Sequence, residues 1–97
     1  MDIKRIEKME RKLDRCTKAT ADLEKQVARM EKLGKDMKEL FEYYGSAEWY
    51  EDREGELPAG VKAGVLSEDA VYDEIEDVRD VAFRMLELAT DILKNRV

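Results

Sequence analysis

The chain has no histidine, one cysteine and one proline among its 97 residues. Without histidine, the commonest general base and metal ligand, the usual hydrolase triads and the histidine-containing di-iron sites of helical bundles are excluded. Cys16 has no partner for an internal disulfide and no histidine to activate it, which favours a reducing cytoplasm and a small buried side chain. No Gly-x-Gly-x-x-Gly or Walker-type phosphate loop occurs. We therefore expect a protein that is not an enzyme and needs no cofactor.

Long hydrophobic runs and an excess of positive charge are also missing. No stretch approaches the roughly 20 apolar residues that cross a bilayer, and residues 1–5 lack the apolar core of a signal peptide, so a cytoplasmic protein without a membrane segment is expected. The net charge is −6, whereas a generic nucleic-acid binder is basic, which disfavours nucleic acid as a partner. The acidic run Glu48–Glu56 lacks the ligand ladder of a calcium loop, so no metal is expected.

What the chain does contain is helical periodicity. It is 43% hydrophobic and 43% charged, a composition typical of a helical protein with a thin core. Over residues 6–44 a heptad pattern predicts a helix that packs lengthwise along another helix. The opposite face carries a basic stripe from Lys4 to Lys32, which is either a solvated face or a docking strip for an acidic surface. The heptad seam consists of Ile6, Met9, Leu13, Cys16, Thr20, Leu23, Val27, Met30, Gly34, Met37, Phe41 and Tyr44.

Gly34 occupies a seam position, where glycine removes a packing side chain and weakens the helix. A kink or break there would give two rods of equal length, residues 6–33 and 68–95. We therefore predict helices over 3–33 and 35–44. The alternative is one straight helix whose overhang is buried by a second chain.

The middle of the chain reads as a packed loop over 45–66 that contains a short helix over 47–53. Gly45 is expected to end the preceding helix and Ser46 to cap the next. Residues 54–66 hold Pro58 and three glycines, which cannot continue a helix, while regularly placed apolar residues indicate that the loop packs down.

Ser67 is the predicted N-cap of a last helix over 68–95, with Asp77 as a second cap that would break it near 76–78. The apolar stripe of this helix is wide and needs more than one neighbour. Together the elements predict an all-α antiparallel helical hairpin, extended into a small bundle, as a single domain over 1–97.

Three sequence blocks stand out, namely Arg5–Glu10, Tyr43–Trp49 and Gly64–Tyr72. The second carries the pattern YYGSxxW and the third GVLSEDxxY. These blocks resemble a family of small bacterial proteins known as domain of unknown function 4298, and the similarity covers nearly the whole chain. The resemblance implies a short, stand-alone, cytoplasmic bacterial protein. It carries no catalytic or binding residue over to this sequence.

Five of the seven aromatic residues lie within residues 41–50. Tyrosine and tryptophan there suit either a plug that anchors the loop or an interface hot spot. The leading hypothesis is a protein-interaction module that uses the 43–72 region to bind a protein partner. The alternatives are a structural homodimer formed through the last helix, a small-ligand binder, and an acidic nucleic-acid mimic that uses the cluster Glu68–Asp80. The candidate partner-binding residues are Tyr43, Tyr44, Trp49, Tyr50, Ser67, Glu68, Asp69 and Tyr72.

Overall fold

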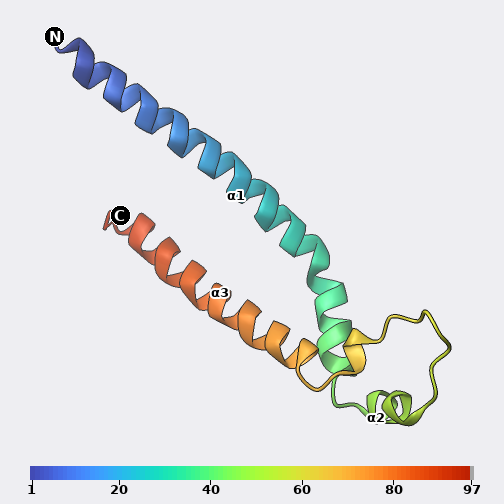
Figure 1. Ribbon diagram of the computed structural model, residues 1–97. Coiled ribbons are helices and arrows are strands. Elements are labelled where there is room, and N and C mark those ends of the chain that lie inside the picture. Colours follow the sequence, from blue (N-terminus) through green and yellow to red (C-terminus); the bar gives the residue numbers. More distant parts are fainter. Residues whose placement is uncertain (97) are drawn as a thin grey trace. The chain divides into compact units, whose positions relative to one another are not determined.

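The computed structural model describes residues 1–96, and over that range its regular structure is entirely helical. The chain forms three α-helices, α1 (Ile3–Tyr43), α2 (Ala47–Glu54) and α3 (Ala70–Leu93) (Figure 1). A 3₁₀ turn, η1 (Gly64–Leu66), lies between α2 and α3. The predicted all-α class is confirmed, with its long first helix, short second helix and C-terminal helix. The chain divides into two units, Met1–Met37 and Lys38–Val97. No helix within residues 1–96 is long and apolar enough to span a membrane.

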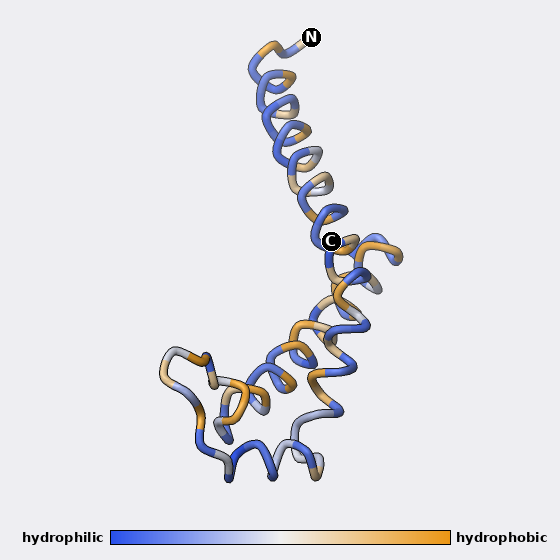
Figure 2. The backbone as a smooth tube through the Cα atoms, turned by 90° about the vertical axis from the view of Figure 1, so that its right-hand side faces the viewer, coloured by the Kyte–Doolittle hydropathy of each residue, from blue (hydrophilic) through white to orange (hydrophobic). Residues whose placement is uncertain are grey.

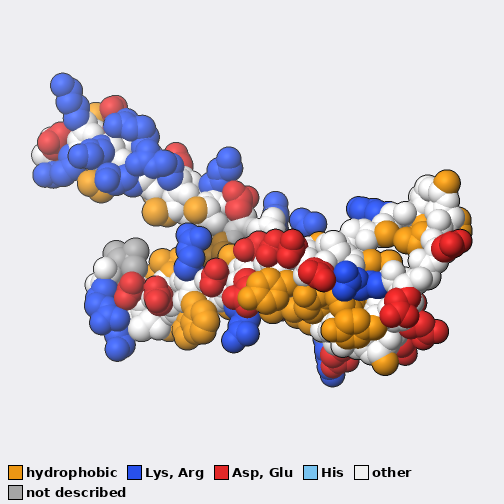
Figure 3. Space-filling model, turned by 60° about the horizontal axis from the view of Figure 1, so that its bottom comes forward, with side chains coloured by type: hydrophobic (Ala, Val, Ile, Leu, Met, Phe, Trp, Pro, Cys, Tyr) orange, Lys and Arg blue, Asp and Glu red, His pale blue; other side chains and the backbone are white. Residues whose placement is uncertain are grey.

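The first unit is one helix. Asp2 caps it, because its Oδ1 accepts the backbone N–H of Arg5 at 3.1 Å. Hydrophobic and hydrophilic residues alternate with each turn, and lysine and arginine cover much of the face that Figure 3 shows (Figures 2 and 3). A single helix has no interior, so the seam side chains have nothing to pack against within this unit. The predicted pairing of the seam with the C-terminal helix stays a prediction.

The predicted end of a helix at Gly34 is wrong. Helical structure continues through Gly34, and α1 ends only at Tyr43. One glycine costs about 1 kcal/mol relative to alanine. The residues on both sides, such as Leu33, Lys35 and Met37, are good helix formers whose hydrogen bonds outweigh that cost.

Replacing Gly34 with alanine should therefore stabilise the helix. A Cβ built at Gly34 meets no atom within 4 Å, so the methyl group introduces no clash. We expect a gain of about 0.5–1 kcal/mol, measured as higher helicity and a higher midpoint of thermal unfolding by circular dichroism. Gly45→Ala is the matched control with the opposite sign, because Gly45 has a φ of +78° that an L side chain strains to adopt. A loss of helicity in Gly34→Ala would contradict this account.

The second unit begins with the end of α1 and a sharp turn. Gly45, with its positive φ, lets the backbone N–H of Ser46 return to the carbonyl of Tyr43 at 3.0 Å. The hydroxyl of Ser46 then accepts the backbone N–H of Trp49 at 3.2 Å and so caps α2. The predicted roles of Gly45 and Ser46 are confirmed, and α2 extends one residue beyond the predicted 47–53.

The capping bond predicted for Ser67 forms, although Asp69 stands at the N-cap position of the C-terminal helix. The Ser67 hydroxyl accepts the backbone N–H of Ala70 at 3.0 Å, and the α-helix starts at Ala70, two residues after the predicted start. The break considered near 76–78 does not occur, because α3 is continuous and Asp77 would have to give up backbone hydrogen bonds to act as a cap. At the other end Asn95 takes a left-handed φ of 57°, and backbone bonds from Asn95 to Ile92 and from Arg96 to Asp91 close a Schellman motif.

The interior of the second unit is small. Trp49 of α2 and Val71 of α3 are its buried hydrophobic side chains, each only 3% exposed. The loop between α2 and η1 makes a wide arc before η1 brings the chain back to the start of α3 (Figure 1). Because η1 contacts both α2 and α3, the two buried side chains lie at the point where the arc closes.

Candidate functional site

The 43–72 region is organised around the indole ring of Trp49. Its Nε1–H donates a hydrogen bond to the backbone carbonyl of Val65 at 3.0 Å, which ties α2 to η1 across sixteen residues of sequence. The rings of Tyr44 and Tyr50 meet the indole edge-on, with centroids 4.9 Å and 5.0 Å away. Such edge-to-face pairs add to the stabilisation from burial. We call Tyr44, Trp49, Tyr50, Arg53 and Val65 the Trp49 cluster.

Arg53 closes the Trp49 cluster with a cation–π contact. Its guanidinium carbon lies 4.6 Å from the centroid of the Trp49 ring, within the range of attraction between a cation and the ring face. The same guanidinium reaches a carboxylate oxygen of Glu68 at 3.5 Å. Because the Glu68 side chain is 75% exposed, this ion pair contributes little stability. The Tyr44 hydroxyl donates to the backbone carbonyl of Glu68 at 2.8 Å, which gives a second tie to the start of α3.

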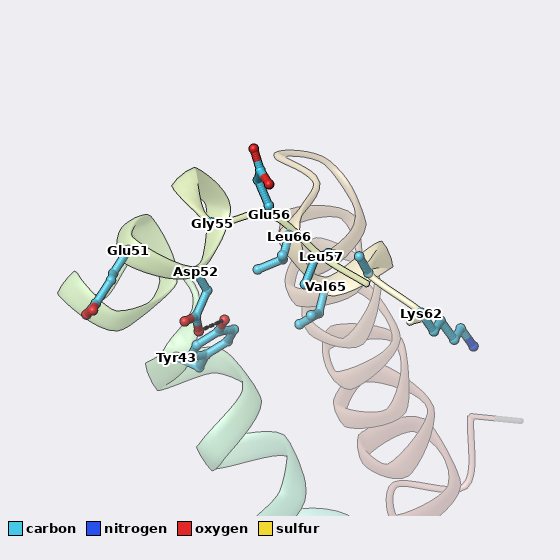
Figure 4. A pocket seen from close by; sticks show the side chains of 10 residues that line it. Tyr43, Glu51, Asp52, Gly55, Glu56, Leu57, Lys62, Val65 and Leu66 are labelled. Atoms are coloured by element: carbon cyan, nitrogen blue, oxygen red, sulfur yellow. Dashed lines mark hydrogen bonds between the residues drawn. The ribbon is translucent and has the colours of Figure 1, made fainter. Parts of the chain in front are cut away.

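An open pocket of about 510 Å³ lies between the end of α1, α2 and the loop. On one side the Tyr43 hydroxyl donates a 2.5 Å hydrogen bond to the Asp52 carboxylate, and on the other Leu57, Val65 and Leu66 gather (Figure 4). The complete lining comprises Tyr43, Glu51, Asp52, Gly55, Glu56, Leu57, Lys62, Ala63, Val65 and Leu66.

The lining combines an apolar floor with a mostly acidic rim. The lining includes three carboxylates, those of Glu51, Asp52 and Glu56, and one ammonium group, that of Lys62. The hydrogen bond to Asp52, then desolvation, and then the negative charges of Asp52 and Glu48 raise the pKa of Tyr43 to about 12. The phenol therefore stays a neutral hydrogen-bond donor at neutral pH and does not act as a base. Such a lining can bind an apolar group beside a positive charge.

The structure distributes the predicted site residues over different roles. Tyr43 lines the pocket. Trp49 is buried and Tyr44 is half-buried, and both belong to the Trp49 cluster that holds the pocket in shape. Ser67 caps α3. Tyr50, Glu68, Asp69 and Tyr72 are exposed.

Sequence reasoning missed most of the pocket lining. Asp52 belongs to the acidic run Glu48–Glu56, which indicates no specific site, and Leu57, Val65 and Leu66 are among the apolar residues that predict only a packed loop. Their apolar spacing in a loop rich in glycine was the available signal. It did not show that Tyr43 and Asp52, nine residues apart, would face them.

The chain matches the family model described as Domain of unknown function (DUF4298) over residues 6–88. It belongs to this family. The matched range includes α2, the loop and η1, so the Trp49 cluster and the pocket both lie within the part of the chain that defines this DUF4298 member. The comparisons with curated proteins and with solved structures found no match.

Removing the indole N–H while keeping an aromatic ring should destabilise the second unit of this DUF4298 protein. In Trp49→Phe the carbonyl of Val65 loses its donor inside the fold, and we expect a loss of about 1–3 kcal/mol. Urea denaturation followed by circular dichroism measures it. Tyr50→Phe, which removes only a hydroxyl from an exposed ring, should change the stability by less than about 0.5 kcal/mol. Equal stability of wild type and Trp49→Phe would show that the bond to Val65 is dispensable.

The Tyr43–Asp52 bond should be visible in a tyrosine titration. We expect Tyr43 to titrate at about 12 instead of the ordinary 10.0, as followed by tyrosinate absorbance. Because the folded-state pKa is raised, the bond contributes fully below pH 10 and its contribution is lost as pH rises towards 12. Asp52→Asn should return the pKa of Tyr43 towards the ordinary tyrosine value, and Tyr43→Phe should remove the titration step near 12. If the step near 12 persisted in Asp52→Asn, the raised pKa would have another cause.

Proposed function

We propose that the second unit is a non-catalytic protein-interaction module of a cytoplasmic bacterial protein. It binds a short segment of a protein partner at the pocket beside Tyr43 and Asp52. One observation carries this proposal: an open apolar floor with an acidic rim is mounted on a loop that the Trp49 cluster holds in place. A surface supported in this way loses little conformational entropy when a partner binds.

The chemistry of the lining selects the partner segment. Leu57 is 49% exposed, and Val65 and Leu66 are half-buried, so the floor offers apolar contact that water now covers. The rim is acidic, and residues 45–97 hold 14 Asp+Glu against 6 Lys+Arg, a net of −8. This charge attracts basic segments and repels acidic ones. We infer a partner segment with a lysine or arginine next to a leucine, isoleucine or methionine.

The openness of the pocket favours a peptide segment over a small molecule. Sites for small ligands usually bury most of the ligand surface, whereas this pocket is open to solvent. The ring of Tyr43 forms one wall and offers the amphipathic contact that interface hot spots use.

Peptide display tests the proposal. Selection of random peptides of about 12 residues on the intact chain should enrich a basic residue beside an apolar one. For a selected peptide, Glu51→Lys combined with Glu56→Lys should raise the Kd about tenfold or more, because the rim then repels the peptide. The matched control is Glu10→Lys combined with Glu24→Lys, which changes the net charge equally but lies in the first unit.

Three results would refute the pocket as the binding surface. One is an acidic consensus, and another is the absence of any consensus among the selected peptides. The third is an equal loss of affinity in the rim variant and in the control, because the loss would then follow from the change in net charge and not from the pocket rim.

A further inference from the structure

Most of α3 presents apolar side chains that its own unit leaves uncovered. The unit packs on the start of α3, where Val71 is buried and η1 is the contacting element. Farther along, the exposed fractions are 48% for Val81, 50% for Met85, 49% for Leu88 and 52% for Ile92. Figure 3 shows exposed hydrophobic side chains along α3, with acidic side chains beside them.

These four residues form one face of the helix. Their spacing of four, three and four residues places them in a single stripe. An open groove along this stripe is lined by Val81, Arg84, Met85, Glu87, Leu88 and Asp91. A contiguous apolar stripe with a polar border is typical of a surface that another protein covers.

The charges beside the stripe indicate what covers it. Arg84 and Asp91 are seven residues apart, so they border the same edge of the stripe. Across residues 1–96 Arg84 forms no salt bridge, and Asp91 pairs at 3.1 Å with the exposed Arg96. One edge of the stripe therefore carries Arg84 and Asp91. When the same edge of a second, antiparallel helix is laid against it, each positive charge meets a negative one.

We propose that two copies of this chain associate through α3, antiparallel, about a two-fold axis that crosses the stripe between Met85 and Leu88. In this arrangement Met85 of each copy lies level with Leu88 of the other, and Val81 with Ile92. Arg84 then lies within about 3 Å, along the helix axis, of Asp91 of the second copy, a distance that its side chain spans. Two-fold symmetry makes both contacts twice. The surface is separate from the pocket and does not rest on the proposed function.

Light scattering coupled to size exclusion tests the association. The mass should rise from the 11.3 kDa of one chain towards twice that value as concentration increases. Leu88→Glu should return the mass to that of one chain, because it puts a charge into the stripe. Phe83→Glu is the control: Phe83 is also exposed, but it lies two residues from Met85 and so off the stripe. Helicity measured by circular dichroism should stay unchanged in both.

A charge-reversal pair tests the antiparallel arrangement itself. Arg84→Asp sets two carboxylates against each other at both contacts, and Asp91→Arg sets two guanidinium groups there, so each variant alone should raise the dimer Kd about tenfold or more. Mixed in equal amounts, the two variants should form a heterodimer, because both contacts again join opposite charges. Glu76→Arg, on the opposite side of α3, should leave association unchanged.

The proposal would be overturned if the mass stayed that of one chain at every concentration up to about 1 mM, where even weak dimers form. The stripe would then be covered by another segment of the same chain or by a different partner. Association that survives both single charge reversals, or a mixture that fails to recover it, would overturn the antiparallel arrangement.

Discussion

The second unit depends on one side chain, the indole of Trp49. A unit with two buried hydrophobic side chains obtains little stability from burial area, so each specific contact counts for more. The bond from the indole to the carbonyl of Val65 fixes the far end of a loop whose residues would otherwise lose backbone entropy without compensation. The contact with Arg53 and the edge contacts with two tyrosines surround the same ring.

The Trp49 cluster also explains how so small a unit can hold an open pocket in shape. By anchoring η1, it sets the apolar floor of the pocket opposite Tyr43 and Asp52. Trp49 is therefore a supporting residue, while the pocket lining consists of less conspicuous side chains such as Leu57 and Leu66. The remaining apolar exposure of the unit lies along α3, at a separate surface. One unit thus offers two chemically different faces, one acidic and concave and one apolar with mixed charges.

Local signals in the sequence were reliable where a few neighbouring residues decide the structure. Gly45 and Ser46 ended one helix and capped the next as predicted, and the Ser67 cap formed its expected bond. The two predicted helix breaks, at Gly34 and near Asp77, were wrong. Gly34 and Asp77 do not interrupt their helices, since a single unfavourable residue costs less than the hydrogen bonds that an interruption breaks.

The sequence by itself determined the helical class, the caps and the aromatic character of the 43–72 region, because periodicity and capping act between residues a few positions apart. It also separated residues 1–44, which carry 12 Lys+Arg against 10 Asp+Glu, from the acidic residues 45–97. Only the tertiary structure decided that Trp49 lies inside and that Tyr43 faces Asp52. It also decided that Leu57, Val65 and Leu66 form a floor opposite them. Those relations join residues far apart in the chain, and the path of a loop rich in glycine is set by the contacts it makes and not by its local preferences.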